Sequence, residues 1–212
     1  ANMLLGNFYI NGNYVEQDTM KAIKYYEKAR GNLDSFVCLG NIYAFGIGVE
    51  RDISKAMTYY MNSSAINNNM HANLMLGDYY YSDKKKQDFK KAKFYYDKLA
   101  QAKNPAGFLK LGILYFNGHG VEKDVNKAKQ YFDMAIMSND PFVINQMGNL
   151  YSAGQYLPQD YFKALKYYKL AAKFNLPVAY YNIALLYFNG YGIQQDFIIA
   201  RQYLETAASL ND

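Results

Sequence analysis

Cysteine and histidine are scarce in this chain of 212 residues. The single cysteine, Cys38, excludes an intramolecular disulfide, and two histidines, His71 and His119, leave little material for a zinc site. The sequence also lacks an apolar run of the ~18–20 residues that a membrane-spanning helix needs. Its net charge of +5 falls far short of the concentrated basic surface typical of nucleic-acid binding. With 51% hydrophobic residues, the chain is expected to fold by packing alone, without a metal or a cofactor.

Six aspartates mark an internal repeat. Similar turn-like segments end in them, as in YAFGIGVERD, YFNGHGVEKD and YFNGYGIQQD, and the spacings are 34, 36, 36, 36 and 36 residues. The aspartates are Asp18, Asp52, Asp88, Asp124, Asp160 and Asp196. A fixed period of this length is typical of a solenoid. We therefore predict a single all-α domain, residues 1–212, in the form of a right-handed α/α superhelical solenoid of six helix-turn-helix repeats. The repeats span approximately 1–30, 35–65, 72–102, 107–137, 143–173 and 179–209.

Each repeat contains two helical patterns. The second helix follows the aspartate and carries an alanine and then an aromatic pair, as in Ala128 and Tyr131-Phe132, at spacings that form one helical stripe. The first helix carries a glycine three residues before a tyrosine, as in Gly112 and Tyr115. A glycine inside a helix costs ~1 kcal/mol relative to alanine. Its recurrence indicates close helix contact, and we expect the alanine of the second helix to fill the space.

The glycines Gly118 and Gly120 lie in the turn between the two helices. Gly118 is expected to end the first helix in the left-handed conformation, and Asp124 to cap the second helix by accepting from its free amides. A phosphate-binding loop is a poor alternative, because it needs a preceding strand and the Gly-Lys-Ser/Thr of a P-loop is missing. Tyr14 and Tyr156 also replace Gly120 in two other repeats. The glycines are therefore interpreted as a structural joint.

The composite pattern L-G-x-x-Y-x-x-G-x-G-V-x-x-D-x-x-K-A-x-x-Y-Y-x-x-A resembles the Sel1-like repeat (SLR), a relative of the tetratricopeptide repeat. The copy from Leu111 to Ala135 matches it almost throughout, and six copies cover the chain. The sixth repeat departs from the pattern, because Ala184 replaces the glycine of its first helix. The resemblance implies a protein-interaction scaffold or adaptor without catalysis. Some relatives carry a disulfide in every repeat and have been linked to β-lactam binding, so a β-lactam-binding hydrolase is the alternative, although a single cysteine separates this chain from that subgroup.

The related tetratricopeptide architecture implies that the first helices line a concave groove. Residues one, four and five positions after the repeat glycine would then be exposed. The candidate binding residues are Asn7, Asn41, Phe45, Asp78, Tyr81, Ile113, Phe116, Asn149, Tyr181, Leu185 and Phe188. Asparagine donates and accepts, so Asn7, Asn41 and Asn149 suit the backbone of an extended peptide, with aromatic residues as anchors. The partner is then a protein or a peptide; the alternative is that Asn and Tyr are simply frequent in this chain.

Two other surfaces are candidates for contact. The third repeat replaces the glycine turn with lysines, among them Lys84, Lys85 and Lys86, which suit an acidic partner or an anionic membrane, although a solvated face is the simpler interpretation. The ends of the solenoid suit self-association or further repeats. The bias toward Asn, Lys, Ile and Tyr resembles that of an AT-rich genome. With the SLR resemblance, it favours a bacterial host-interaction or virulence factor that is secreted, periplasmic or host-exposed.

No catalytic residue is predicted. The six aspartates recur with the same chemistry in every copy, which argues against a unique pair of acid and base. The two histidines provide no obvious nucleophile pair with serine or cysteine.

Overall fold

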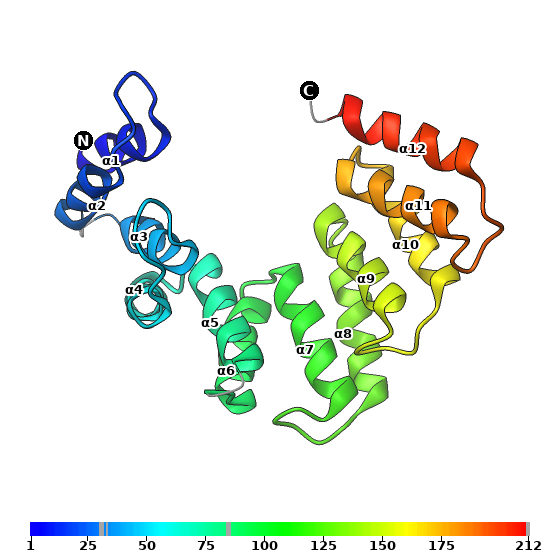
Figure 1. Ribbon diagram of the computed structural model, residues 1–212. Coiled ribbons are helices and arrows are strands. Elements are labelled where there is room, and N and C mark those ends of the chain that lie inside the picture. The colour runs from blue at the N-terminus through cyan, green and yellow to red at the C-terminus, as the bar shows by residue number, and fades with distance from the viewer. Residues whose placement is uncertain (30–31, 33, 84–85, 211–212) are drawn as a thin grey trace. The chain divides into compact units, whose positions relative to one another are not determined.

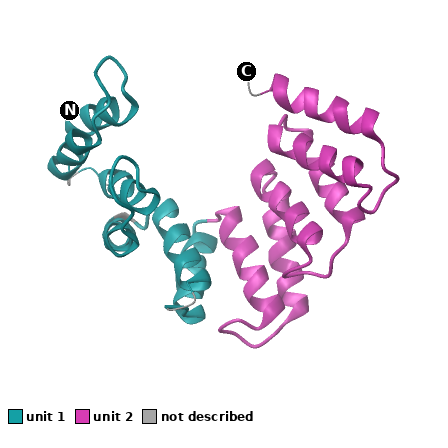
Figure 2. Ribbon diagram, in the orientation of Figure 1, with its two compact units in different colours: residues 1–102 teal, residues 103–212 magenta. Residues whose placement is uncertain are grey.

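The structure, a computed structural model, describes residues 1–29, 32, 34–83 and 86–210, which form twelve α-helices and no strand (Figure 1). The chain divides into two compact units, residues 1–102 and 103–212 (Figure 2). Unit 1 contains α1 (Asn2–Asn11), α2 (Thr19–Lys28), α3 (Asp34–Phe45), α4 (Ile53–Asn67), α5 (Met70–Ser82) and α6 (Phe89–Gln101). Unit 2 contains α7 (Pro105–Asn117), α8 (Val125–Met137), α9 (Pro141–Ala153), α10 (Tyr161–Ala172), α11 (Pro177–Asn189) and α12 (Phe197–Ser209).

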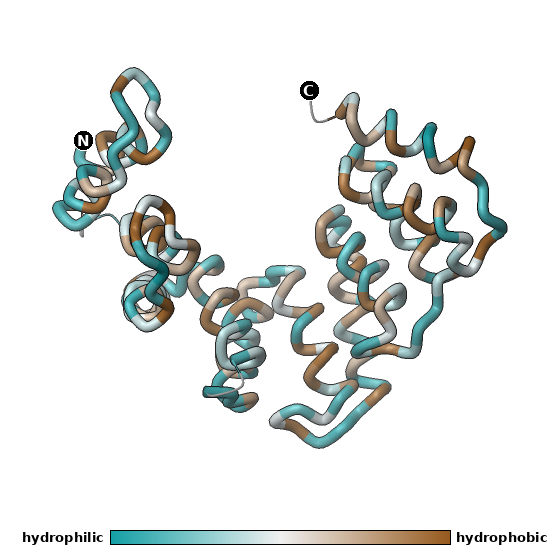
Figure 3. The backbone as a smooth tube through the Cα atoms, in the orientation of Figure 1, coloured by the Kyte–Doolittle hydropathy of each residue, from teal (hydrophilic) through white to brown (hydrophobic). Residues whose placement is uncertain are grey.

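Consecutive helices pack in pairs, and each pair is one repeat. In unit 1, α1 packs on α2, α3 on α4 and α5 on α6; in unit 2, α7 packs on α8, α9 on α10 and α11 on α12. Successive pairs also touch within a unit, through α2 and α3, α4 and α5, α8 and α9, and α10 and α11. Hydrophobic and hydrophilic residues are mixed along the helices (Figure 3), and the buried hydrophobic residues lie where the helices pack on one another. The predicted all-α solenoid is confirmed.

The predicted turn and cap are both present. The backbone of Gly118 is left-handed, with φ 74° and ψ 28°, and its N–H donates to Leu114 O at the end of α7. Asp124 begins α8 by accepting from the backbone N–H of Lys127 at 2.9 Å. The corresponding aspartate caps the second helix in each of the other five repeats. Gly120 is also left-handed, with φ 70°, and so is Tyr14, with φ 64°.

These caps make the stability of the solenoid sensitive to acid. Asp18, Asp88 and Asp160 each accept from the backbone N–H three residues later, and this bond lowers the pKa of each carboxyl below its usual 3.8. A carboxyl whose pKa is lower in the folded state stabilises that state above the unfolded pKa, and the contribution is lost as pH falls through the folded pKa. The melting temperature is therefore expected to decrease as the pH is lowered below about 4.

Circular dichroism melts between neutral pH and about pH 2 measure this effect. The control changes Asp18, Asp88 and Asp160 to Asn, because asparagine caps helices about as well as aspartate but does not titrate. The control should melt at a temperature that depends less on pH. An equally steep acid loss in the control would assign the loss to other carboxyls.

Candidate functional site

The repeat glycine brings the two helices of a repeat into direct contact. A Cβ added to it would lie less than 3.0 Å from the ring of the second aromatic residue of the partner helix. The pairs are Gly6–Tyr26, Gly40–Tyr60, Gly77–Tyr96, Gly112–Phe132 and Gly148–Tyr168. The expectation that alanine fills this space is therefore wrong: the buried alanine, such as Ala164, lies one helical turn earlier, and the ring occupies the space. In the sixth repeat Ala184 replaces the glycine and Leu204 replaces the ring.

The hydroxyl of the same tyrosine donates to the residue that follows the glycine. The pairs are Tyr26–Asn7 at 2.8 Å, Tyr60–Asn41 at 2.7 Å, Tyr96–Asp78 at 2.7 Å and Tyr168–Asn149 at 2.9 Å. The fourth and sixth repeats have Phe132 and Leu204, which carry no hydroxyl, and there the residue after the glycine position is Ile113 or Leu185. The polar side chain therefore occurs where the hydroxyl needs an acceptor.

The predicted asparagine ladder is thus first a structural feature. Each tyrosine occupies the side-chain oxygen of its asparagine, while the amide N–H groups keep their capacity to donate. Neighbouring repeats extend these contacts: His71 Nε2 lies 3.0 Å from Asn41 Oδ1, and Asn182 Nδ2 donates to Asn145 Oδ1 at 3.0 Å. Burial lowers the pKa of His71, which favours its neutral ring beside the amide.

In unit 1, the predicted aromatic anchors differ in their exposure. Phe45 at the end of α3 is 63% exposed. Tyr81 at the end of α5 is half-buried and makes an edge contact with Phe89, with 5.5 Å between ring centroids. Phe45 is therefore the predicted anchor in unit 1 that is most available to a partner.

In unit 2, one candidate is buried and three are exposed together. Ile113 is only 7% exposed, because it packs in the repeat whose second helix carries a phenylalanine, so it is not available to a ligand. Tyr181, Leu185 and Phe188 are 47%, 38% and 50% exposed, and their spacing of four and three residues places them on one face of α11. We call these three residues the α11 strip. Phe116 is half-buried, with Lys123 Nζ 5.7 Å from the centroid of its ring.

A stack of two tyrosines and a lysine was missed by the sequence analysis. The tyrosine of the first helix stacks on the first aromatic residue of the second helix, as Tyr43 does on Tyr59 with 5.9 Å between centroids. Lys55 Nζ lies 3.9 Å from the centroid of the Tyr43 ring, a cation–π contact. The signal was a lysine three residues after the capping aspartate in five repeats, at Lys21, Lys55, Lys91, Lys127 and Lys163. This lysine therefore links the start of the second helix to the tyrosine ring of the first helix in each of those repeats.

Other candidate chemistry is limited in the part of the chain that the structure describes. There, no group of three His, Cys, Asp or Glu residues is placed to hold a metal ion, and no helix is long and apolar enough to cross a membrane. Lys84 and Lys85 lie outside the described residues. Lys86 is exposed, and its backbone N–H donates to Asp83 O.

The repeats also match a known protein family. The model of the Sel1 repeat matches residues 1–30, 39–60, 71–104, 109–140, 142–173 and 177–212. The chain belongs to the Sel1 repeat family. Sel1 repeat proteins generally mediate protein–protein interactions and are generally not enzymes. A comparison with curated proteins gives no significant match.

Solved Sel1 repeat structures are similar over nearly the whole chain. A Sel1 repeat protein from Oxalobacter formigenes is 28% identical, with a TM-score of 0.71 over 98% of this chain and 86% of that chain. A protective antigen with an SLR fold from uropathogenic Escherichia coli is 24% identical, with a TM-score of 0.66 over 98% of this chain and 45% of the antigen. An immunity protein from Pseudomonas aeruginosa, Pa5087, is 20% identical, with a TM-score of 0.61 over 90% of this chain and 74% of its own. The last two likenesses concern the fold alone.

Proposed function

We propose that this Sel1 repeat protein is a non-catalytic scaffold that binds a partner protein or an extended peptide through its first helices. The observation that carries the proposal is the α11 strip, where three apolar or aromatic side chains are exposed on one helix face. Large side chains exposed together in this way are typical of interaction surfaces. Tyr181 is suited to anchor a partner, because tyrosine contributes a large rigid ring and a polar tip.

The amides that flank these anchors favour a partner with free carbonyl groups. Asn149 accepts from Tyr168 and Asn182, so its oxygen is occupied while its N–H groups can donate outward. The equivalent asparagines of unit 1, Asn7 and Asn41, are bonded to tyrosine in the same way. A peptide backbone that is not paired within a sheet or helix offers the acceptors that such donors need.

The test compares Tyr181→Ala with Phe94→Ala, which removes an exposed aromatic side chain from a second helix, α6. Peptides selected from a random phage-displayed library against the full chain serve as ligands, and fluorescence polarisation measures their affinity. Tyr181→Ala is expected to weaken binding by about tenfold or more, and Phe94→Ala to leave it unchanged. Phe45→Ala tests the anchor of unit 1 separately.

Equal affinity for Tyr181→Ala, Phe45→Ala and the unchanged chain would place the binding surface elsewhere. Turnover of the chromogenic β-lactam nitrocefin by the purified chain would instead favour the hydrolase alternative.

A bacterial host-interaction role is a narrower form of this proposal. Its support is the composition bias described above. Labelling of intact and of lysed source cells with an antibody against the chain tests it, because a host-exposed protein is labelled before lysis. Labelling only after lysis would reject host exposure.

A further inference from the structure

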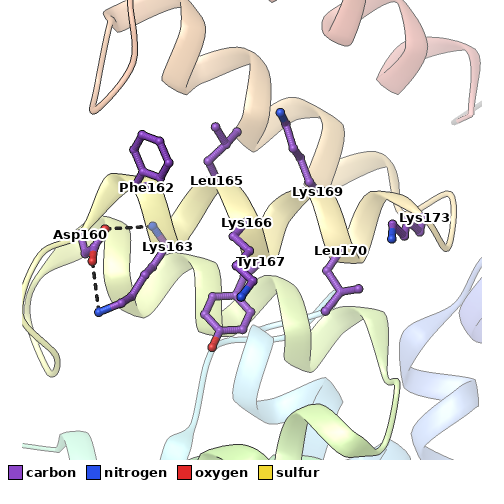
Figure 4. Close-up of a pocket in the computed structure, with 9 residues that line it drawn as sticks. All are labelled: Asp160, Phe162, Lys163, Leu165, Lys166, Tyr167, Lys169, Leu170 and Lys173. Carbon is purple, nitrogen blue, oxygen red and sulfur yellow. Dashed lines mark hydrogen bonds and ion pairs between the residues drawn. The ribbon is translucent and has the colours of Figure 1, made fainter.

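Helix α10 lines a groove in which apolar side chains and lysines lie side by side, with Lys166 between Leu165 and Leu170 (Figure 4). Its volume is about 690 Å³, within the range typical of ligand sites. Leu165 is only 8% exposed, and Tyr167 and Leu170 are half-buried against the core of unit 2, whereas Phe162 is 72% exposed at one end. The groove therefore has recessed apolar walls and a single protruding ring.

Four lysines line the same groove: Lys163, Lys166, Lys169 and Lys173. Their spacing of three, three and four residues places them on one face of the helix. Lys163 is neutralised by Asp160, with 3.2 Å between Nζ and Oδ2. The other three are exposed, and none forms an ion pair with any residue that the structure describes. Helix α10 contains no Asp or Glu after its capping residue, and Asp133 of α8 is the one acid from another helix that acts on a described lining residue, Tyr167. The three lysines therefore leave this face with a net positive charge.

The charge of this face is a departure from the repeat. Nine residues after the capping aspartate, four other second helices carry an acid, at Glu27, Asp97, Asp133 and Glu205. In α10 this position is Lys169, which reverses the charge. Where the acid is kept, it has structural partners: Tyr59 of the next repeat donates to Glu27 at 3.4 Å, and Lys93 pairs with Asp97 at 2.6 Å.

Helix α2 provides an internal comparison for this groove. The same repeat positions on α2 line a smaller groove of about 340 Å³, where Met20, Ile23 and Lys24 correspond to Phe162, Leu165 and Lys166, and Glu27 corresponds to Lys169. Of these two grooves, the α10 groove is the larger, and it has three lysines beyond the Asp160–Lys163 pair where the α2 groove has Lys24 and Glu27.

We propose that the α10 groove docks an acidic amphipathic segment of a partner protein. Apolar side chains of the segment enter between the lysines and cover Leu165 and Leu170, while its carboxylates pair with Lys166, Lys169 and Lys173. Charge complementarity of this kind raises the association rate and selects against basic partners. A flat bilayer surface fits less well, because the apolar walls lie below the lysines. This surface belongs to a second helix, so it is separate from the first-helix surface proposed above.

The test uses a fluorescein-labelled peptide of about 15 residues, with leucine at heptad positions a and d and glutamate elsewhere, which presents an apolar stripe and carboxylates when it is helical on the groove. Fluorescence polarisation with the full chain measures binding. Lys166→Glu with Lys169→Glu is expected to weaken binding by about tenfold or more. Lys24→Glu, the matched change in the α2 groove, is expected to have no effect, and Phe162→Ala to weaken binding. Raising salt from ~50 to ~300 mM should weaken binding to the unchanged chain and have a smaller effect on the double variant.

Any of the following binding results would overturn the proposal. The peptide fails to bind the unchanged chain; the double variant binds it as well as the unchanged chain does; or phosphatidylserine vesicles are bound through these lysines while the peptide is not. Since the three lysines are exposed, circular dichroism is expected to show an unchanged fold for the variants. Carbodiimide cross-links between peptide carboxylates and Lys166 or Lys169, mapped by mass spectrometry, would support the location, and cross-links to Lys24 alone would contradict it.

Discussion

Replacement of Tyr60 by alanine is expected to lower the free energy of unfolding by about 3–5 kcal/mol. Tyr60 is fully buried, and its ring atoms are the nearest neighbours of the space beside Gly40. The truncation leaves a cavity between α3 and α4, and the glycine on the opposite wall has no side chain with which to fill it. Urea unfolding followed by circular dichroism measures the loss.

The matched variant Tyr60→Phe keeps the ring and removes only the hydroxyl. It leaves Asn41 without its donor from Tyr60, although His71 still lies 3.0 Å from the same oxygen, so a loss of about 1 kcal/mol is expected. Burial raises the pKa of Tyr60 to about 12, so the hydroxyl remains protonated throughout a measurement at neutral pH. Equal losses for the two variants would show that the hydrogen bond, and not the ring volume, stabilises the pair.

Replacement of Gly148 by alanine is expected to destabilise the fold by about 1–3 kcal/mol, because the new methyl group would overlap the ring of Tyr168. This result would run against helix propensity, since alanine is ~1 kcal/mol more favourable than glycine within a helix. Thermal and urea unfolding of the full chain measure the change. A variant as stable as the unchanged chain would mean that the two helices of this repeat separate without cost.

The sixth repeat supplies the rescue for this variant. It contains Ala184, Leu185 and Leu204 where the fifth contains Gly148, Asn149 and Tyr168. The triple variant Gly148→Ala, Asn149→Leu and Tyr168→Leu therefore copies the residues that the sixth repeat has at these positions. It is expected to recover part of the stability that Gly148→Ala loses, because leucine vacates the space of the ring and leaves no hydroxyl without an acceptor. The recovery is incomplete because Tyr168 is buried and leucine is smaller, whereas Leu204 is 40% exposed. Failure of the rescue would indicate that the three positions do not act as a set.

The repeat, its helices and its joints could be predicted because they depend on local chemistry. Asp124 was predicted as a cap and Gly118 as a left-handed helix end from their places beside a helical pattern, and both predictions are confirmed. The residue opposite the glycine was predicted wrongly. Ala128 and Phe132 lie one turn apart on the same helix face, and spacing alone does not say which of them meets Gly112.

The binding surface was less predictable, because the exposure of a side chain depends on its partner helix. Ile113 and Asn149 occupy the same repeat position, yet Ile113 is buried and Asn149 is exposed. A comparison of the copies would have indicated the structural role of these side chains, since Asn or Asp follows the glycine where the second helix carries the tyrosine hydroxyl, and Ile or Leu follows where it does not. The cationic face of α10 was also accessible from the sequence, through the charge reversal at Lys169, but the recessed apolar walls required the structure.

The packing of the repeat glycine against the aromatic ring affects how an array of repeats can gain or lose copies. The glycine, the ring that packs on it and the residue that accepts the hydroxyl all lie within one repeat, so a tandem duplication of that segment carries its own complementary partners. The array can therefore gain or lose whole repeats without compensating substitutions at the glycine–ring contact of the other repeats. Positions outside this packing contact differ between copies, as at Glu27 and Lys169, which occupy the same place in their repeats.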